Sequence, residues 1–391
     1  MLHLLGLLLS LCLGLFLVDA VVSLLDDSLI LFGGMHGLSI FRELISFFAV
    51  LMAIGIYGLI GVTPSVPKRL FLPIPLFCLA TMLAVFPFAI YCFGRLPQVA
   101  VGFSIGQVLL ALGILYLSQG GFKFRWPLVP ADRLGARSFS WGNLTAFILL
   151  NGFVLLPAVL IYLFVCASLA VGHFSDGFMA LHPGGLSVQV RKYVRDDGKT
   201  IELFPMAHVA DAGFYGQVSQ AFPSNSIILM EGVTDVKNLL TNKLSYQRMA
   251  KSLGLSEQKK KFVPVKGKAV RADIDVDQFS QETLEILNLV TLIHAKGLTP
   301  ENLQRLMQFS PSPQIQEQLF EDILWKRNRH LLEEIQSHLS QSDSLMVPWG
   351  VAHMPWIAGE IQKAGFHLGE THEYMLIRFV GTGNNGKDVR P

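Results

Sequence analysis

The pattern of hydrophobic and polar positions divides the chain into two parts near residue 172. Before that point, apolar runs are long enough to form helices that cross a membrane, because a span needs about 20 apolar residues. Five such runs are present, at 2–18, 44–62, 71–93, 99–117 and 144–171. We therefore predict a transmembrane region of about five helices over residues 1–172.

The first apolar run, 2–18, resembles a secretory signal in length. It has no basic start, and Ala20-Val21-Val22 offers no small-x-small cleavage site, so we predict an uncleaved helix. The stretch 29–37 is short and glycine-rich and is predicted to extend a loop or form a re-entrant segment. Asp26 and Asp27 then fall between spans. No span is predicted to carry a buried charge in its middle, which argues against an ion or proton pathway.

Beyond residue 184 the pattern changes to short strands that alternate with helices. Segment 185–194 alternates apolar and polar positions, and "RDDGK" after it indicates a hairpin turn in which Gly198 takes positive φ. Further extended segments are predicted at 200–209, 226–232, 261–276, 344–350 and 373–379, and helices at 234–255, 280–297, 299–309, 315–339 and 355–365. This alternation predicts one α/β domain over 173–380, with a mixed sheet flanked by helices. Residues 381–391 are predicted to form a disordered tail.

Composition places the chain among membrane proteins. Hydrophobic residues make up 51% and charged residues 15% of its 391 positions, against about 45–50% and about 25% in soluble domains. With 31 Lys and Arg against 29 Asp and Glu, no polyanionic partner is indicated, so we expect membrane lipid as a partner and no nucleic acid. The four cysteines all lie in the apolar part and form no C-x-x-C pair, which indicates neither a thiolate metal site nor a disulfide framework.

Basic residues gather in two of the loops between predicted spans. Lys68 and Arg69 lie between the second and third spans. The loop between the fourth and fifth spans contains Lys123, Arg125, Arg133 and Arg137. Because basic loops stay in the cytoplasm, the N-terminus is predicted inside and everything after about Gly172 outside. We expect an integral protein of the bacterial inner membrane with an extracytoplasmic C-terminal domain.

Three side chains that can bind a metal stand at the ends of predicted strands. His208 ends "ELFPMAH", Glu231 follows "IILM" and His353 ends "MVPWGVAH". Because strand carboxyl ends converge on one crevice in an α/β sheet, these residues should lie together. Two imidazoles and a carboxylate form a ligand set for Zn, Mn, Fe or Co, and such a metal can activate a bound water. Hydrogen-bonded structural histidines are the alternative, and the spacing does not decide between the two.

The helix predicted at 315–339 carries polar residues on its apolar face. Asn328 falls within the apolar stripe, Arg327 at its edge and Arg329 further toward solvent. The stripe itself consists of Phe320, Leu324, Leu331 and Ile335. Because buried polar groups need partners, Arg327 is a candidate to hold a carboxylate, either Glu231 or one on a substrate. Alternatively, Arg327 extends from the edge of the stripe into water.

The segment "RADIDVD" places Asp273, Asp275 and Asp277 at every second position, on one face of an extended strand. A calcium loop would have a glycine at its sixth position and a glutamate at its twelfth, and Leu284 stands at that twelfth position. We therefore predict that the three aspartates are solvated residues of an edge strand.

Four motifs in order resemble the TraB/Tiki superfamily, which is related to the erythromycin-esterase-like and ChaN-like proteins. They are "FPMAH", "ILMEG", the Arg-Asn pair in "KRNRHLL", and "GVAHMPWIAGEIQKAGF". The family pattern has two G-x-x-H motifs, with a Glu and an Arg-Asn between them. The second motif is intact from Gly350 to His353, whereas Pro205 stands where the first has glycine. The resemblance covers about residues 202–379.

The resemblance implies a membrane-tethered or extracytoplasmic domain. Tiki-type members of the superfamily are similar to metal-dependent proteases. Other relatives bind haem or limit peptide signalling. It implies a divalent-metal or catalytic centre of His208, Glu231 and His353, with Arg327 orienting a carboxylate or a reaction oxyanion. Asn328, the other member of the Arg-Asn pair, is implied as a further catalytic residue. We expect a metal-dependent hydrolase with a peptide or small-molecule substrate, and no oligomeric state is indicated. The alternatives are a binding module that sequesters haem, a metal or a signalling peptide, and a membrane scaffold without chemistry.

Overall fold

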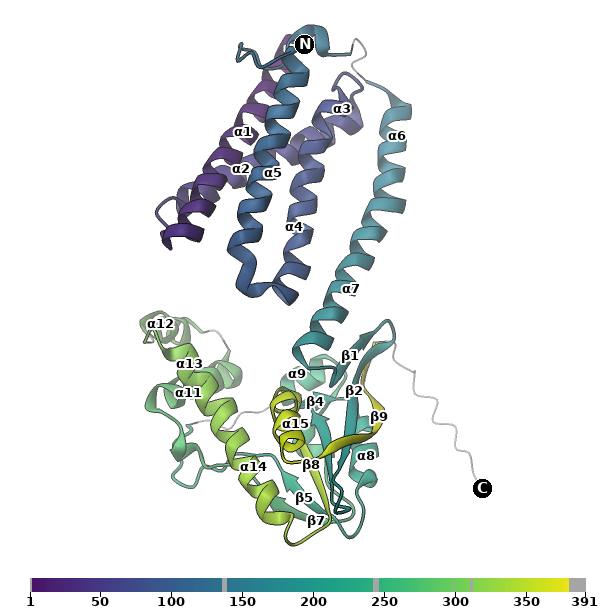
Figure 1. The fold of residues 1–391 in the computed structure, drawn as a ribbon, viewed down its shortest axis with the longest axis vertical. Helices are drawn as coiled ribbons and strands as arrows, with labels where there is room; N and C mark the ends of the chain where they lie inside the picture. The colour runs from purple at the N-terminus through teal and green to yellow at the C-terminus, as the bar shows by residue number, and fades with distance from the viewer. Residues whose placement is uncertain (1, 136–138, 242–245, 298, 310–311, 380–391) are drawn as a thin grey trace, which may run out of the picture. The chain divides into compact units, whose positions relative to one another are not determined.

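The computed structural model of the protein describes residues 2–135, 139–241, 246–297, 299–309 and 312–379. The chain divides into two compact units, Met1–Ala167 and Ser168–Pro391, called here the helical unit and the sheet unit (Figure 1). It passes from one to the other within helix α7 (Leu156–Phe174), close to the predicted boundary at residue 172. The predicted tail, 381–391, lies outside the described residues.

The helical unit consists mainly of long apolar helices, and its longest connection runs from α5 to α6. Its helices are α1 (Leu2–Gly33), α2 (Ser39–Val62), α3 (Lys68–Phe71), α4 (Pro73–Tyr91), α5 (Leu96–Gln119), α6 (Trp141–Leu150) and the first part of α7. A π-helical turn, Asn151–Leu155, joins α6 to α7, and 3₁₀ turns lie at Phe93–Arg95 and Ala131–Arg133. Within the described residues, 5 helical segments could cross a membrane by their length and composition. The prediction of about five long apolar helices is confirmed.

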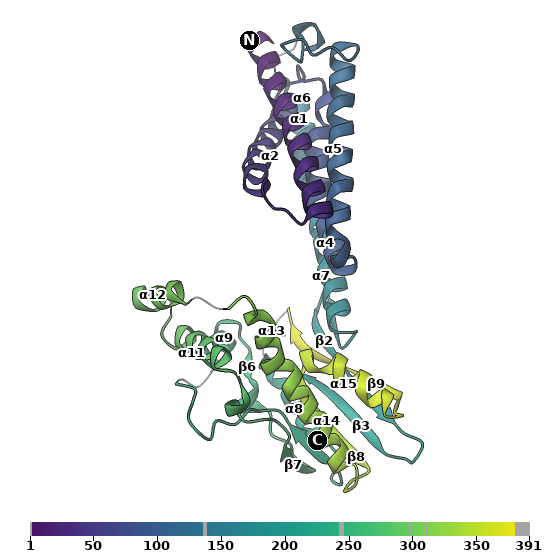
Figure 2. The same cartoon turned by 60° about the vertical axis from the view of Figure 1, so that its left-hand side comes forward.

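Helix α1 differs from its prediction. It packs against α2 and α5 (Figures 1 and 2) and runs to Gly33 instead of ending near residue 18. Asp19, Asp26 and Asp27 are therefore helical and buried, so the prediction that no span holds a buried charge is wrong. The segment from 29 to 33 is helical too, not a loop. The prediction from hydropathy is wrong here because side chains on neighbouring helices donate hydrogen bonds to the three carboxylates. The hydropathy of a local segment does not contain information about such partners.

The sheet unit is built on a 7-stranded mixed sheet with the order β1-β2-β3-β8-β5-β7, and β9 pairs with β2. These strands are β1 (Met179–His182), β2 (Gly185–Val194), β3 (Thr200–Met206), β5 (Ile227–Met230), β7 (Lys268–Arg271), β8 (Ser344–Gly350) and β9 (His367–Arg378). Strands β3, β8, β5 and β7 run parallel, and β1, β2 and β9 are antiparallel. A separate two-stranded sheet joins β4 (Val209–Ala210) to β6 (Ser256–Glu257). The turn between β2 and β3 contains Gly198 at φ +84°, as predicted.

Helices cover both faces of the sheet, which confirms the predicted fold class. One face is covered by α14 (Lys326–His338) and α15 (Met354–Lys363), and the other by α8 (Ala212–Ala221) and the residues after α10 (Gln258–Lys261). Each face of the sheet has its own hydrophobic core, and successive side chains of a strand point into the two cores in turn. In β5, Ile227 and Leu229 lie in one core and Ile228 lies in the other. The remaining helices are α9 (Gln247–Ser252), α11 (Gln281–Lys296), α12 (Pro300–Gln308) and α13 (Ile315–Phe320), with a π turn at Glu321–Trp325 and 3₁₀ turns at Val276–Gln278 and Val351–His353.

The largest error in the predicted elements lies at 234–255. This segment was predicted as one helix, but among its described residues only those of α9 are helical. Asp235 accepts hydrogen bonds from two backbone N–H groups further along, and Thr234 forms an isolated parallel bridge with Asp275. Such side-chain bonds offer the backbone an alternative to a helix, as Asp and Thr commonly do.

Strands β8 and β5 separate before they reach their carboxyl ends. They pair over only two residues of each strand, whereas β8 stays paired with β3 as far as Gly350. Beyond that pairing, the indole N–H of Trp349 donates to the carbonyl oxygen of Leu229 at 2.9 Å and bridges the gap. The separation leaves room between the two strand ends for the side chains of the candidate site.

Candidate functional site

The candidate site lies where the four parallel strands end. His208 follows β3, Glu231 follows β5, Asp273 follows β7, and His353 follows β8 after one 3₁₀ turn. Because loops at strand carboxyl ends converge in such sheets, three of these residues meet around Arg327 of α14. The predicted convergence is therefore correct for Glu231 and His353.

Glu231 closes the gap between β5 and β8. Its Oε2 accepts a hydrogen bond from the backbone N–H of Gly350 at 2.6 Å, and its Oε1 accepts one from Nη2 of Arg327 at 2.8 Å. The side chain is 9% exposed. An unpaired carboxylate after an apolar strand would be costly, and these two donors explain why Glu231 is tolerated there.

Arg327 is the cation at the centre of the site. Its Nε and Nη2 donate to the two oxygens of Asp273 at 3.0 and 2.7 Å, and Nη2 also donates to Glu231. Burial works against the charged form, but the hydrogen bonds and charges of these carboxylates raise the pKa of Arg327 above its ordinary value. Of the two partners proposed from the sequence, the structure shows Glu231. Asn328 is fully buried, and Arg329 is exposed, as the helical pattern predicts.

Asp273 is a member of the site that the sequence analysis missed. Its side chain has no exposed area, forms the two-bond pair with Arg327, and accepts a hydrogen bond from the N–H of Gly232 at 2.9 Å. The prediction of a solvated edge residue is wrong for Asp273. It follows β7 in the same way that Glu231 follows β5, and applying the strand-end rule to this strand would have found it. Strand β7 is short and mostly exposed, so its hydropathy gave little reason to do so.

His353 is buried with a defined tautomer. Its Nδ1 lies 2.5 Å from Oδ1 of Asn328, and since that oxygen can only accept, Nδ1 carries the proton. The unprotonated Nε2 lies 3.7 Å from Oε1 of Glu231 and 3.4 Å from Nη1 of Arg327. Burial lowers the pKa of His353 to about 4, and the charge of Arg327 acts in the same direction while Glu231 opposes it. At neutral pH the site therefore presents a neutral imidazole whose unprotonated Nε2 accepts a long hydrogen bond from Nη1 of Arg327.

Asn328 fixes the ring of His353 at an energetic cost. Its Nδ2 is fully enclosed by protein and has no hydrogen-bond partner among the residues that the structure describes. Leaving a buried donor unsatisfied costs about 1–3 kcal/mol. Buried donors without a partner are rare in folded proteins, and those that persist often serve a function.

His208 lies on a different wall of the site. It is exposed, its ring stacks on Tyr246 with centroids 4.7 Å apart, and its Nδ1 lies 3.3 Å from Oε1 of Gln258. His208, Glu231 and Arg327 all line one cavity of about 320 Å³. The proline of the first motif, Pro205, lies in β3 beyond its pairing with β2, so it has a strand neighbour on one side only.

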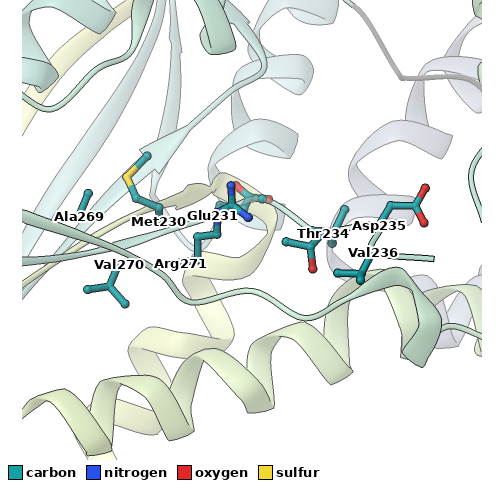
Figure 3. Close-up of a pocket in the computed structure, with 10 residues that line it drawn as sticks. Met230, Glu231, Thr234, Asp235, Val236, Ala269, Val270 and Arg271 are labelled. Carbon is teal, nitrogen blue, oxygen red and sulfur yellow. The ribbon is translucent and has the colours of Figure 1, made fainter. Parts of the chain in front are cut away.

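A second hollow adjoins Glu231 on the side of β7. It has a volume of about 700 Å³ and is lined by the segment from Met230 to Val236 and by Ala269, Val270 and Arg271. Figure 3 shows Glu231 between Met230 on one side and Thr234 on the other. Glu231 also lines the cavity that contains His208, so the residue borders two hollows.

The three predicted metal ligands are not gathered into one ligand set. Glu231 and His353 are neighbours, whereas His208 is an exposed residue that lines a cavity with Glu231 but not with His353. Within the described ranges, no three His, Cys, Asp or Glu side chains lie in a group that could hold a metal as they stand. The donor chemistry nevertheless fits a divalent metal, because ligating histidines are neutral and hold their other ring N–H against an acceptor, as His353 does.

Comparisons of the chain with protein-family models, with curated proteins and with solved structures found no match.

Proposed function

We propose that the sheet unit is a metal-dependent hydrolase of the TraB/Tiki type, with a peptide as the first candidate substrate. The observation that carries the proposal is the state of His353: a neutral imidazole whose Nδ1–H is held by Asn328 and whose Nε2 lone pair is directed toward Glu231 and Arg327. A divalent metal would be held by His208, Glu231 and His353, and when bound it would lower the pKa of a water molecule toward neutrality.

The residues of the chain have separate roles in this proposal. Glu231 supplies the negative charge of the site, and its position between two hollows places it beside a substrate bound in either. Arg327 holds a permanent positive charge that would stabilise an oxyanion, because Asp273 fixes its guanidinium by two hydrogen bonds. Asn328 is a positioning residue, which acts through the orientation of His353.

Metal content separates this proposal from its alternatives. In the full chain purified in detergent, stripped with a chelator and reloaded with zinc or manganese, we expect one bound metal per chain. His353→Ala and His208→Ala should abolish it, and Asn328→Ala should weaken affinity about 10–100-fold. Hydrolysis of a fluorogenic peptide library should fall with metal content.

The matched control is His367→Ala, which removes an exposed histidine of β9 and should leave metal binding unchanged. Wild-type metal affinity in both His208→Ala and His353→Ala would refute the joint site. Metal binding without hydrolysis would support the binding module, and a Soret band on addition of haem would identify haem as its ligand. Absence of both metal and haem would favour a scaffold.

The same proposal places the helical unit in the bacterial inner membrane, with the sheet unit outside the cytoplasm. Its support is the set of 5 helical segments of spanning length among the described residues, together with basic residues near their ends. Lys68 and Arg69 begin the third segment, and Arg125 and Arg133 lie between the fourth and fifth. Alkaline phosphatase fused after Gly172 should be active, and β-galactosidase fused there should be inactive. The opposite pair of results would place the sheet unit in the cytoplasm.

A further inference from the structure

The helical unit contains a polar cavity that the hydrolase proposal does not use. It has a volume of about 320 Å³ and is lined by residues of α1, α2, α4 and α5. Its polar lining includes Asp19, Ser23, Arg42, Ser46, Ser104 and Gln107. Polar side chains on helices that are apolar enough to span a membrane cost free energy, and they usually serve a function.

The charges around this cavity do not balance. Arg42 bonds to both Asp26 and Asp27, so its one positive charge is shared by two carboxylates. Asp19 is a third, buried carboxylate, and its hydrogen-bond partners among the described residues are neutral: Ser46 donates to Oδ1 at 2.5 Å, and Gln107 donates to Oδ2 at 2.7 Å. Excess negative charge in a low-dielectric bundle attracts a cation strongly.

Ser23 supplies an independent indication of a ligand. It lies one helical turn after Asp19, is 4% exposed, and lines the cavity. Among the described residues its hydroxyl has no hydrogen-bond partner, and the hydroxyl oxygen is not fully enclosed by protein. A buried hydroxyl normally has such a partner, so the Ser23 hydroxyl is available to a molecule in the cavity.

The remaining lining indicates what kind of cation fits. Phe77, Phe88 and Phe103 line the cavity, and the rings of Phe88 and Phe103 pack edge to face with centroids 5.9 Å apart. Aromatic rings attract organic ammonium groups through their faces. The volume lies at the lower end of the range for organic ligands, about 300–1,000 Å³, and is far larger than a bare metal ion requires.

We propose that this cavity binds a small organic cation that carries a protonated amine. The ammonium group donates hydrogen bonds to Asp19 and to the Ser23 hydroxyl, and the attached carbon chain lies against the three phenylalanines. This inference is independent of the chemistry proposed for the sheet unit.

The test is equilibrium dialysis of the full chain, purified in detergent micelles, against labelled n-butylammonium at pH 7, with empty micelles as the blank. We expect saturable binding to the wild type. Asp19→Asn should weaken it at least tenfold, because it keeps the shape and removes the charge, and Ser23→Ala should weaken it about threefold. Asp132→Asn and Ser28→Ala are the matched controls, since Asp132 is exposed and the Ser28 hydroxyl bonds to the carbonyl of Leu24.

Several results would overturn the proposal: no saturable binding to the wild type, wild-type affinity in Asp19→Asn, or equal competition by neutral n-butanol. Displacement by sodium chloride but not by choline chloride at the same ionic strength would identify an inorganic cation instead. If Asp19→Asn does not elute as a monodisperse species, the comparison of Ser23→Ala with Ser28→Ala and of butylammonium with butanol decides the question.

Discussion

Arg327→Met is expected to destabilise the sheet unit by about 3–5 kcal/mol, because it leaves two buried carboxylates without their cation. Glu231 is 9% exposed and Asp273 is fully buried, so water does not replace the lost hydrogen bonds. Methionine keeps most of the volume of the arginine stem, which limits the contribution of lost packing. Pulse proteolysis of the full chain in detergent across a urea series measures the change.

Two further variants separate the charge effect from packing. Arg329→Met removes an exposed arginine from the same helix, which pairs with Glu321, and should change stability by less than about 0.5 kcal/mol. Combining Arg327→Met with Glu231→Gln and Asp273→Asn removes the uncompensated charges and should recover a large part of the loss. A combined variant as unstable as Arg327→Met alone would show that packing, not charge, explains the effect.

The sheet unit is expected to lose stability as the pH falls from about 6.5 toward 4, by up to about 3 kcal/mol. Burial lowers the pKa of His353 from its ordinary 6.5 to about 4. Between these values the unfolded chain binds a proton at this histidine and the folded chain does not, so acid favours the unfolded state. The contribution of neutral His353 to the free energy of unfolding is therefore fully present above pH 6.5. Pulse proteolysis at a series of pH values measures the slope.

Substitutions at and beside His353 test whether this residue causes the loss of stability between pH 6.5 and 4. His353→Gln should flatten the slope between pH 6.5 and 4, because no group at that position titrates. Asn328→Asp should also reduce the slope, since a carboxylate against Nδ1 would raise the pKa of His353. Burial acts to raise the pKa of Asp322, but hydrogen bonds from Lys326 and Ser280 lower it to about 2. Asp322 therefore affects the pH dependence of stability only below the tested range. An unchanged slope in His353→Gln would assign the titration to another group.

The candidate site was largely, but not fully, predictable from strand ends. His208, Glu231 and His353 were found because each closes an apolar run that predicts a strand, and parallel strands bring their ends together. Asp273 was missed because β7 has too little apolar character to be read as a buried strand. His208 is exposed and stacks on Tyr246, and its ring also contacts Gln258 at the start of α10. Both partners are distant in the sequence, so no pattern near His208 predicts its position.

Local patterns alone determined the five long apolar helices, the alternation of strands and helices, and the buried face of α14. These features follow from hydropathy and periodicity, which are properties of neighbouring residues. The tertiary structure decided which polar groups meet the buried charges, although Glu231 was one of the two partners expected for Arg327. Arg327 meets Asp273 and Glu231 across 54 and 96 positions, and Asp19 meets Gln107 across 88. Burial of a charge costs free energy unless such partners are supplied in space, and the neighbouring positions of the sequence do not contain these partners.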